Sequence, residues 1–379
     1  MSINLAGRTG VSGRVMLGQS AWKGHENEKV TLEVRNGANI LCLAAPRYGK
    51  GALCKNIAVQ ISKFKKVCIF DYRGEWSRQV TQYNQYSSNP EKLTDCFIAR
   101  NFVFTISEFS SMGDWVGLGM TQEEAFVMSK IVNSAYHGND MGKVKEMIAA
   151  IPIKMDEVEK FNEDYGVDLI VTVNFNTRAA LGTRFGVLQR LFWQGPDDER
   201  QILNFRKIWL DFKNLIVDMT DYYFGFKDKF RANAYAGLIL RKMKPTFEVT
   251  QGFYVVEEAS QLLGNIGSQN GVENWSSVPE FHKIVLDLLT LAPKQGVNLL
   301  LLAQSKRQVY QELLPYISVF LVGRLNPMDE LTEHEKRFNA SIFLRPGVKR
   351  REWWLWDTFY QLDFKFVAAE PCCEYETNL

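Results

Sequence analysis

The sequence has few of the residues that bind metals or form disulfides. It contains four scattered histidines and six cysteines among 379 residues, and the cysteines lack zinc-knuckle spacing. The cysteines are Cys42, Cys54, Cys68, Cys96, Cys372 and Cys373. Four of them lie in or beside apolar segments that are expected to form the core. We therefore predict reduced, buried thiols, an intracellular protein and no structural metal.

Long apolar runs and a signal sequence are also missing. The most apolar run covers residues 297–303, whereas a membrane-spanning helix needs about 20 such residues. A signal peptide has a basic stretch followed by an apolar one, and the N-terminus has no such pattern. We expect a soluble, cytoplasmic protein with no transmembrane segment, tethered to a membrane only through a partner.

Charge of one sign is not in excess, because 45 Lys and Arg face 43 Asp and Glu, for a net charge of +2. This balance excludes a wholly basic, histone-like protein. It does not exclude a local basic surface that binds nucleic acid. Hydrophobic residues make up 46% of the chain, enough for a sizeable core. The length allows one large domain or two ordinary ones, and no repeat or low-complexity segment is present.

The first third of the chain has the pattern of alternating strands and helices. Residues 14–34 predict two short strands around a polar turn, and the apolar run at 39–45 predicts a strand covered on both faces. Apolar residues at helical spacing follow over 51–64. Further buried strands are predicted at 66–71 and 101–106. A strand, a helix and a strand at this length predict a parallel sheet.

The middle of the chain is different, because residues 111–208 are mostly helical in pattern. A capping-box sequence, Thr121-x-x-Glu124, opens one of these helices. For residues 167–175 the pattern allows a strand as an alternative to a helix. Buried strands are again predicted after this insertion, at 214–219, 252–258, 297–304 and 317–325. The segment 340–356 predicts a strand, a Pro-Gly turn and an aromatic strand.

The stretch "LCLAAPRYGKGAL", residues 41–53, joins a buried strand to a helix. Such a turn offers backbone N–H groups and a helix N-terminus to an anion. Gly49 permits close approach and Lys50 reaches the outer phosphates. The usual pattern G-x-x-x-x-G-K-[ST] is broken at Ala44 and at Gly51, so a purely structural turn stays open. The candidate nucleotide-binding residues are Ala45, Pro46, Arg47, Tyr48, Gly49, Lys50, Gly51 and Ala52.

Polar residues follow three other predicted strands. Glu257 and Glu258 end one strand, where carboxylates of nucleotide hydrolases hold Mg²⁺ through water and polarise the attacking water. Glu257 is assigned the metal and Glu258 the water. The alternative is a pair of solvated acids that open a helix, where the helix dipole favours negative charge. Gln304 ends another strand, where its amide can sense the γ-phosphate. Asp71 and Glu75, in "FDYRGEW", add carboxylates near the phosphate loop.

These motifs together resemble the HerA/FtsK superfamily of ring-shaped DNA-pumping ATPases, and the HerA branch most of all. The matching segments, in the family's order, are the phosphate loop, Asp71–Trp76, Glu257–Ala259, Gly296–Ser305 and Arg324–Glu330. The resemblance covers roughly residues 36–110 and 210–370. The Gly-Lys-Gly of the loop is similar to that of type IV coupling proteins in the same superfamily.

The resemblance implies an α/β fold: a RecA-like P-loop ATPase core with a mainly parallel sheet and an inserted, mainly helical domain. The implied division is a β segment at 1–35, core at 36–110, helical insertion at 111–208, and core at 209–379 ending in a β-hairpin. ATP and Mg²⁺ are the implied cofactors, and a homo-oligomeric ring, a hexamer, is the implied assembly. Arg324 is the first candidate for an arginine finger given to a neighbouring subunit, and Arg184 and Arg190 are the others.

The ring would pump double-stranded DNA without reading its sequence. Residues 265–283, with Asn270 and Lys283, and residues 305–308 are the candidate pore segments. Residues 349–356 mix basic and aromatic side chains and either stack on bases or pack in the core.

The resemblance leaves the physiological use open between genome packaging, conjugative transfer and end processing beside a nuclease. A nuclease, portal or secretion channel would be the partner. About 35 residues precede the core, too few for a HerA barrel or a coupling-protein anchor, which favours a virus- or plasmid-encoded packaging ATPase. Gly51 motivates the rival, an inactive nucleotide-binding ring with a structural role. A monomeric P-loop kinase is disfavoured because the sequence has no arginine-rich lid.

Overall fold

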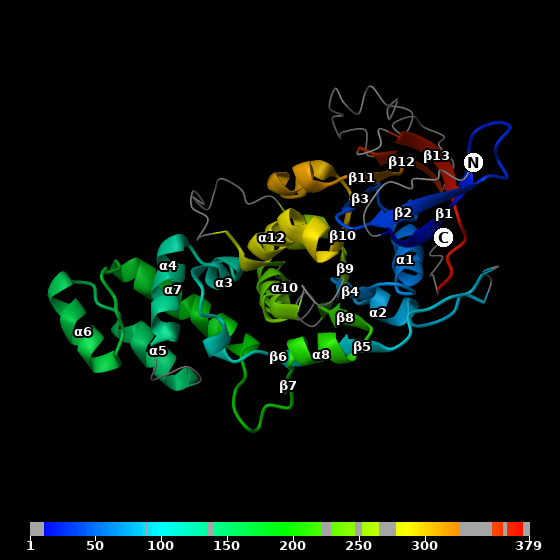
Figure 1. The fold of residues 1–379 in the computed structure, drawn as a ribbon. Coiled ribbons are helices and arrows are strands. Elements are labelled where there is room, and N and C mark those ends of the chain that lie inside the picture. The colour runs from blue at the N-terminus through cyan, green and yellow to red at the C-terminus, as the bar shows by residue number, and fades with distance from the viewer. Residues whose placement is uncertain are drawn as a thin grey trace.

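The computed structural model describes residues 11–85, 87, 89–134, 140–220, 229–246, 252–264, 278–325, 351–358 and 362–373. Figure 1 shows two parts: a broad sheet flanked by helices, and a group of helices that extends away from one side of it. The sheet part holds the predicted phosphate loop, Asp71, Glu257, Glu258, Gln304 and Arg324.

Eleven strands form one sheet in the order β2-β1-β13-β12-β11-β3-β10-β9-β4-β8-β5. The strands are β1 Val11–Ser20, β2 Lys29–Arg35, β3 Ile40–Leu43, β4 Lys66–Asp71, β5 Cys96–Ala99, β8 Asn214–Asp218, β9 Gly252–Val256, β10 Asn298–Ala303, β11 Val319–Val322, β12 Glu352–Asp357 and β13 Leu362–Ala368. From β11 to β5 all neighbours pair in parallel, and the other pairs are antiparallel. The predicted α/β class with a mainly parallel sheet is confirmed.

The central strands are buried along their whole length because helices cover both faces of the sheet. Successive residues of β3 point to opposite faces. Ile40 and Cys42 belong to the core on the side of α1 (Lys50–Ile61). Leu41 and Leu43 belong to the core shared with α10 (Lys229–Met243) and α12 (Glu280–Gln295). All six cysteines are free, and all but Cys96 are buried.

The remaining α-helices of the described residues are α2 Glu75–Gln79, α3 Met112–Gly117, α4 Gln122–Asn133, α5 Met141–Ala150, α6 Val158–Tyr165, α7 Phe175–Leu188, α8 Phe205–Asp211 and α11 Ala259–Leu262. The capping box before α4 forms: the Thr121 hydroxyl accepts from the Glu124 N–H, and the Glu124 carboxylate accepts from the Thr121 N–H. No helix in the described ranges combines the length and the apolar character needed to cross a membrane.

The structure corrects one predicted strand and decides a second segment for which a strand was left open. The sheet strand near residue 100 is β5, which ends before Asn101 because that residue has a left-handed backbone with φ 46°. Residues 102 and 103 form β6 (Phe102–Val103), which pairs only with β7 (Gln201–Ile202). Residues 167–174 form no strand. The Asn162 side chain bonds both the N–H and the carbonyl of Leu169, where a neighbouring strand would otherwise do so.

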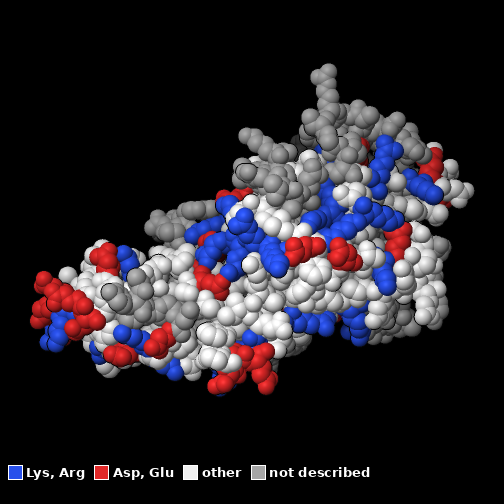
Figure 2. Space-filling model, turned by 60° about the horizontal axis from the view of Figure 1, so that its bottom comes forward, with Lys and Arg blue, Asp and Glu red and all other residues white. Residues whose placement is uncertain are grey.

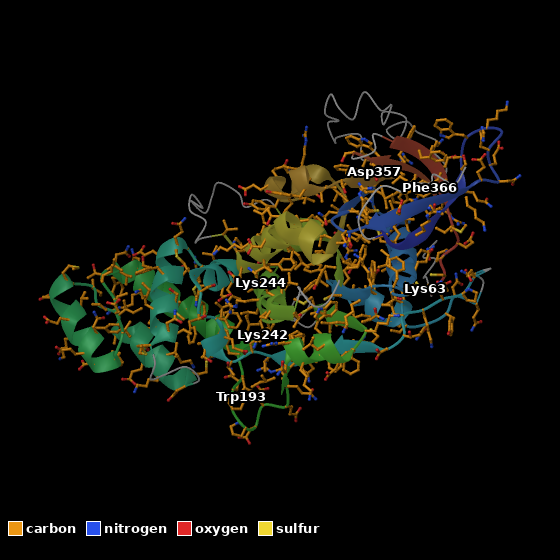
Figure 3. All side chains as sticks on the ribbon, viewed as in Figure 1. Lys63, Trp193, Lys242, Lys244, Asp357 and Phe366 are labelled. Atoms are coloured by element: carbon orange, nitrogen blue, oxygen red, sulfur yellow. The ribbon has the colours of Figure 1, made fainter. Side chains whose placement is uncertain are left out.

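Ion pairs fix the helical part to the sheet part through α10. The Arg241 guanidinium lies 3.0 Å from the buried Asp114 carboxylate of α3. The next basic residue, Lys242, pairs with Glu108. Lys244, just beyond α10, lies 2.8 Å from Asp287 of α12. Figure 3 shows Lys242 and Lys244 at the junction between the two parts.

Candidate phosphate and metal site

The turn between β3 and α1, residues 44–50, is here called the phosphate loop. Gly49 is the N-cap of α1 and has a left-handed backbone with φ 96°, as has Arg47 with φ 62°. Pro46 and Arg47 are exposed, while Ala45 and the residues from Gly49 to Ala52 are partly exposed. Because the first N–H groups of a helix have no partner within the helix, the start of α1 can bind an anion, with Lys50 on its first turn.

The strands on either side of β3 hold the base of this loop. The Ala44 N–H donates to the carbonyl of Ala303 (3.3 Å) and the Ala45 N–H to that of Arg324 (2.7 Å). The loop therefore begins between the ends of β10 and β11. Gln304, which is partly buried, follows β10, and Arg324, which is exposed, lies just past β11. The structure thus brings both predicted polar residues to the loop of their own chain.

The Tyr48 side chain packs against β12. Its ring lies edge-on to Trp353, with centroids 5.3 Å apart, and its hydroxyl donates to the carbonyl of Glu352 at 2.5 Å. Burial raises the pKa of Tyr48 to about 12. Tyr48 thus anchors the loop to β12, and only its backbone is placed to meet a phosphate. Trp353 is buried, so the packing interpretation of the aromatic strand holds for this residue.

The two glutamates after β9 lie at the same sheet edge, and β10 separates β9 from β3. Val256 is in register with Leu301 of β10 and with Phe70 of β4. The Glu257 N–H donates to the Phe70 carbonyl at 3.2 Å. Glu257 is therefore level with Asp71, the last residue of β4, and Glu258 follows one residue later. The parallel register brings together the ends of three strands that are far apart in the sequence.

Glu257 and Asp71 form a buried carboxyl pair. Burial raises the pKa of both groups, and the neighbouring Asp71 carboxylate raises that of Glu257 further. The pair therefore shares a proton when no cation is present. The Ser77 N–H donates to Asp71 Oδ2 at 2.8 Å, while no N–H or hydroxyl of the described residues donates to the buried Asp71 Oδ1. Two adjacent carboxylates with a free oxygen fit a hydrated Mg²⁺, which commonly takes one or two carboxylates plus phosphates.

Arg73 contacts both glutamates from the loop after β4. Its N–H donates to Glu257 Oε2 at 3.2 Å, and its guanidinium Nη2 lies 2.9 Å from Glu258 Oε1. Glu258 has a left-handed backbone with φ 47°, which is uncommon for a residue other than glycine and recurs at functional sites. Arg73 was missed from the sequence because only the fold brings this segment to β9.

A further acid at this edge was also missed. Asp218 ends β8 and is in register with Asp71. It accepts from Arg100 Nε at 2.7 Å, and Arg100 also donates to the Ser77 hydroxyl at 2.6 Å. A signal was present, because the segment "NLIVD" ends in an acid just as "KVCIFD" does.

The alternative finger arginines lie in the segment of α7 and the turn after it. Arg184 pairs with Glu124 of α4 at 2.5 Å, and the carbonyl of Arg190 accepts from Arg200. Neither of these contacts involves the phosphate loop, so Arg324 is the candidate that the structure places there.

The candidate DNA-binding segments are covered only in part. Asn270 and most of the 265–283 segment lie outside the described residues, as do residues 326–330, 349 and 350. Lys283 is partly buried and lies 4.0 Å from Glu280. In the segment 305–308, Arg307 and Gln308 are exposed.

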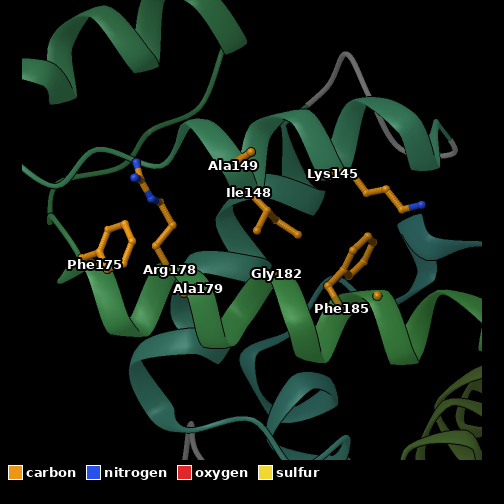
Figure 4. Close-up of a pocket in the computed structure, with 9 residues that line it drawn as sticks. Lys145, Ile148, Ala149, Phe175, Arg178, Ala179, Gly182 and Phe185 are labelled. Carbon is orange, nitrogen blue, oxygen red and sulfur yellow. The ribbon is translucent and has the colours of Figure 1, made fainter.

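A groove of about 320 Å³ lies elsewhere, between α5 and α7 of the helical part. Figure 4 shows it lined by Ile148, Phe175 and Phe185, with Lys145 and Arg178 toward its ends. Its walls are mainly apolar and carry no carboxylate. This lining does not suit a nucleotide with a hydrated metal, so the groove is separate from the site at the sheet edge.

Sequence comparison gives no match, either to a family model or to a curated protein. Comparison with solved structures gives several. The bacterial conjugative coupling protein TrwB superposes with a TM-score of 0.58 at 14% identity, covering 91% of this chain and 87% of that one. VirB4 of Thermoanaerobacter pseudethanolicus superposes with a TM-score of 0.56 at 15% identity, covering 98% and 99%.

The chain has the fold of TrwB and VirB4. This confirms the resemblance inferred from the motifs at the level of the fold, including the RecA-like arrangement of the sheet. The plasmid coupling protein TrwB has been solved with non-hydrolysable analogues of GTP and ATP and with ADP and Mg²⁺.

Proposed function

We propose that this chain is an ATP-hydrolysing motor of the HerA/FtsK type, which forms a hexameric ring and moves DNA through it. One observation carries the proposal: a single sheet edge brings together the phosphate loop, Gln304, the Glu257–Glu258 pair and Asp71. A turn with only a structural role requires none of these polar partners. Nucleotide and Mg²⁺ in the TrwB structures support ATP and Mg²⁺ as the cofactors.

Each residue at the edge has a chemical role in this proposal. Lys50 and the N–H groups at the start of α1 bind the β- and γ-phosphates. Glu257 and Asp71 would hold a hydrated Mg²⁺, which offsets phosphate charge when bound. Glu258 accepts a proton from the attacking water, and the Gln304 amide orients that water or the γ-phosphate.

Arg324 is proposed to stabilise the charge that develops during transfer, an effect worth on the order of 10³–10⁵ in rate for an arginine finger. It lies beside the loop of its own chain. It can serve a neighbour's site only if the ring packs this edge of the sheet against the next subunit.

Surface charge supports an interaction with DNA at the sheet part rather than at the tip of the helices. Figure 2 shows Lys and Arg gathered over the middle of the face and toward the sheet part, and acidic residues at the end that carries α6. Residues 154–168 contain Asp156, Glu157, Glu159, Glu163, Asp164 and Asp168. This acidic end would be repelled by a phosphate backbone. It would face away from the DNA, toward the nuclease, portal or secretion-channel partner.

A structural ring without hydrolysis is the second candidate, because Gly51 lacks the hydroxyl that usually binds Mg²⁺. The test is ATP hydrolysis with Mg²⁺, with and without linear duplex DNA, for the natural protein and for Glu258→Gln. Glu159→Gln, an exposed acid on α6, is the matched control. DNA-stimulated hydrolysis that disappears only in Glu258→Gln supports the motor. ATP binding without hydrolysis in every variant supports the structural ring.

A further inference from the structure

Helix α1 carries a second lysine, Lys55, whose surroundings are unlike those of an ordinary surface lysine. Its side chain is buried, with 3% of the residue exposed. Among the described residues it forms no ion pair. A buried ammonium without a carboxylate partner is costly, so such groups are retained where another charge needs them.

The partners of the Lys55 ammonium lie on α2, which follows β4. Nζ donates to the Gln79 amide oxygen of α2 and lies 5.5 Å from the centre of the Trp76 ring. Both partners are neutral, so they position the charge without cancelling it. They belong to the same helix as Ser77, whose N–H donates to Asp71 Oδ2, so the ammonium lies on the side of the carboxyl pair.

The ammonium also faces the position where the hydroxyl is missing. A Cβ built on Gly51 would lie 3.9 Å from Lys55 Nζ, the one atom within 4 Å of it among the described residues outside the adjacent residues and the helix's own backbone. The hydroxyl of a serine at residue 51 would thus lie near an ammonium. The chain therefore lacks a hydroxyl at residue 51 at the place where Lys55 supplies a positive charge.

We propose that Lys55 is a second cation of the nucleotide site, a positioning residue that favours binding of a magnesium–nucleoside triphosphate complex where residue 51 offers no hydroxyl. The inference rests on the proposed function, because it assumes that the phosphate loop binds a nucleotide. It concerns affinity for the metal complex, so it holds for a hydrolysing ring and for a structural one.

The experiment measures binding of a fluorescent ATP analogue to the full chain, with Mg²⁺ and with EDTA, beside thermal unfolding of the free protein. Lys55→Met should weaken binding with Mg²⁺ about tenfold, which corresponds to about 1.4 kcal/mol. The same variant should leave the melting temperature unchanged or raise it, because it removes a buried charge. A structural lysine would lower both, so a fall in melting temperature together with affinity contradicts the proposal.

Three further variants separate the explanations. Lys63→Met removes a lysine just after α1 that is exposed and paired with Glu91, and it should bind as the natural protein does. Gly51→Ser should restore affinity in the Lys55→Met background. The same substitution should not raise the affinity of the natural protein. Equal binding by Lys55→Met and Lys63→Met overturns the inference. If Lys50→Met also binds normally, the proposed nucleotide site itself is wrong.

Discussion

Gly323, just after β11, is the position where one added methyl group should disturb the phosphate loop most directly. A Cβ at this residue would lie 2.5 Å from two carbons of the Tyr48 ring and 3.0 Å from Trp353. Ordinary contact begins at 3.4 Å, so the ring has to move by about 0.9 Å. Tyr48 belongs to the phosphate loop, and Gly323→Ala should therefore act on both stability and nucleotide binding.

The size of the effect follows from two contributions. Overpacking of a filled core costs about 1 to 3 kcal/mol. The hydrogen bond from the Tyr48 hydroxyl to the Glu352 carbonyl is strained or lost when the ring moves, which costs about 1 kcal/mol more. We expect Gly323→Ala to lower the free energy of unfolding by about 2 to 4 kcal/mol and to weaken nucleotide binding at least about tenfold.

Urea unfolding and fluorescent-nucleotide binding test this expectation. The control is Gly182→Ala in α7, where the added Cβ meets only Ile148 at an ordinary 3.9 Å. Since glycine within a helix is less stable than alanine, this control should gain about 0.5 to 1 kcal/mol. If Gly323→Ala unfolds within about 0.5 kcal/mol of the natural protein, Tyr48 does not hold the loop as described.

Three further predictions concern charged groups. Arg73→Ala should lower the turnover rate of ATP about tenfold with little change in nucleotide affinity, because the proposed base Glu258 loses the guanidinium that positions it. Equal turnover by the variant refutes this positioning role of Arg73. The pKa of Glu257 is raised by burial, so the folded protein keeps this proton to higher pH than the unfolded chain, and stability falls as pH rises above about 4.5. Glu257→Gln should remove that fall in pH-dependent unfolding and lose magnesium-dependent nucleotide binding; an unchanged pH profile contradicts it. Burial lowers the pKa of His282 to about 4, so stability should fall by about 3 kcal/mol between pH 6.5 and 4, and urea unfolding of His282→Asn should show a smaller fall.

The sheet was predictable because the central strands are continuous apolar runs. Residues 40–43, 214–218, 252–256 and 298–303 are buried, and that burial is visible in the sequence because the interior of each range is apolar, with polar residues only at its ends. The polar residues that follow such runs then fall at one edge of a parallel sheet, which is why Glu257 and Gln304 could be named in advance.

The contacts around those residues were not predictable in the same way. Arg73 reaches the two glutamates, and Lys55 reaches Gln79 and Trp76, through side-chain directions that depend on the register of β4 and β9 and on the packing of α2 against α1. A single left-handed residue, Asn101, moved the expected strand to residues 96–99. Patterns of hydrophobicity do not encode such backbone breaks, because asparagine is common in loops of every kind.

The departure at Gly51 is the strongest sequence argument against a working site, and the structure gives it a different meaning. A serine or threonine hydroxyl supplies one neutral ligand to the metal, whereas this edge offers two adjacent carboxylates, Asp71 and Glu257, with one buried oxygen that has no donor. A ring kept only for structure has no need to bury a proton-sharing carboxyl pair beside a phosphate loop, since that burial is unfavourable without a cation. Glycine at 51 is then compatible with the metal site, and the expected consequence is a stronger dependence on the two carboxylates than in an enzyme with the hydroxyl.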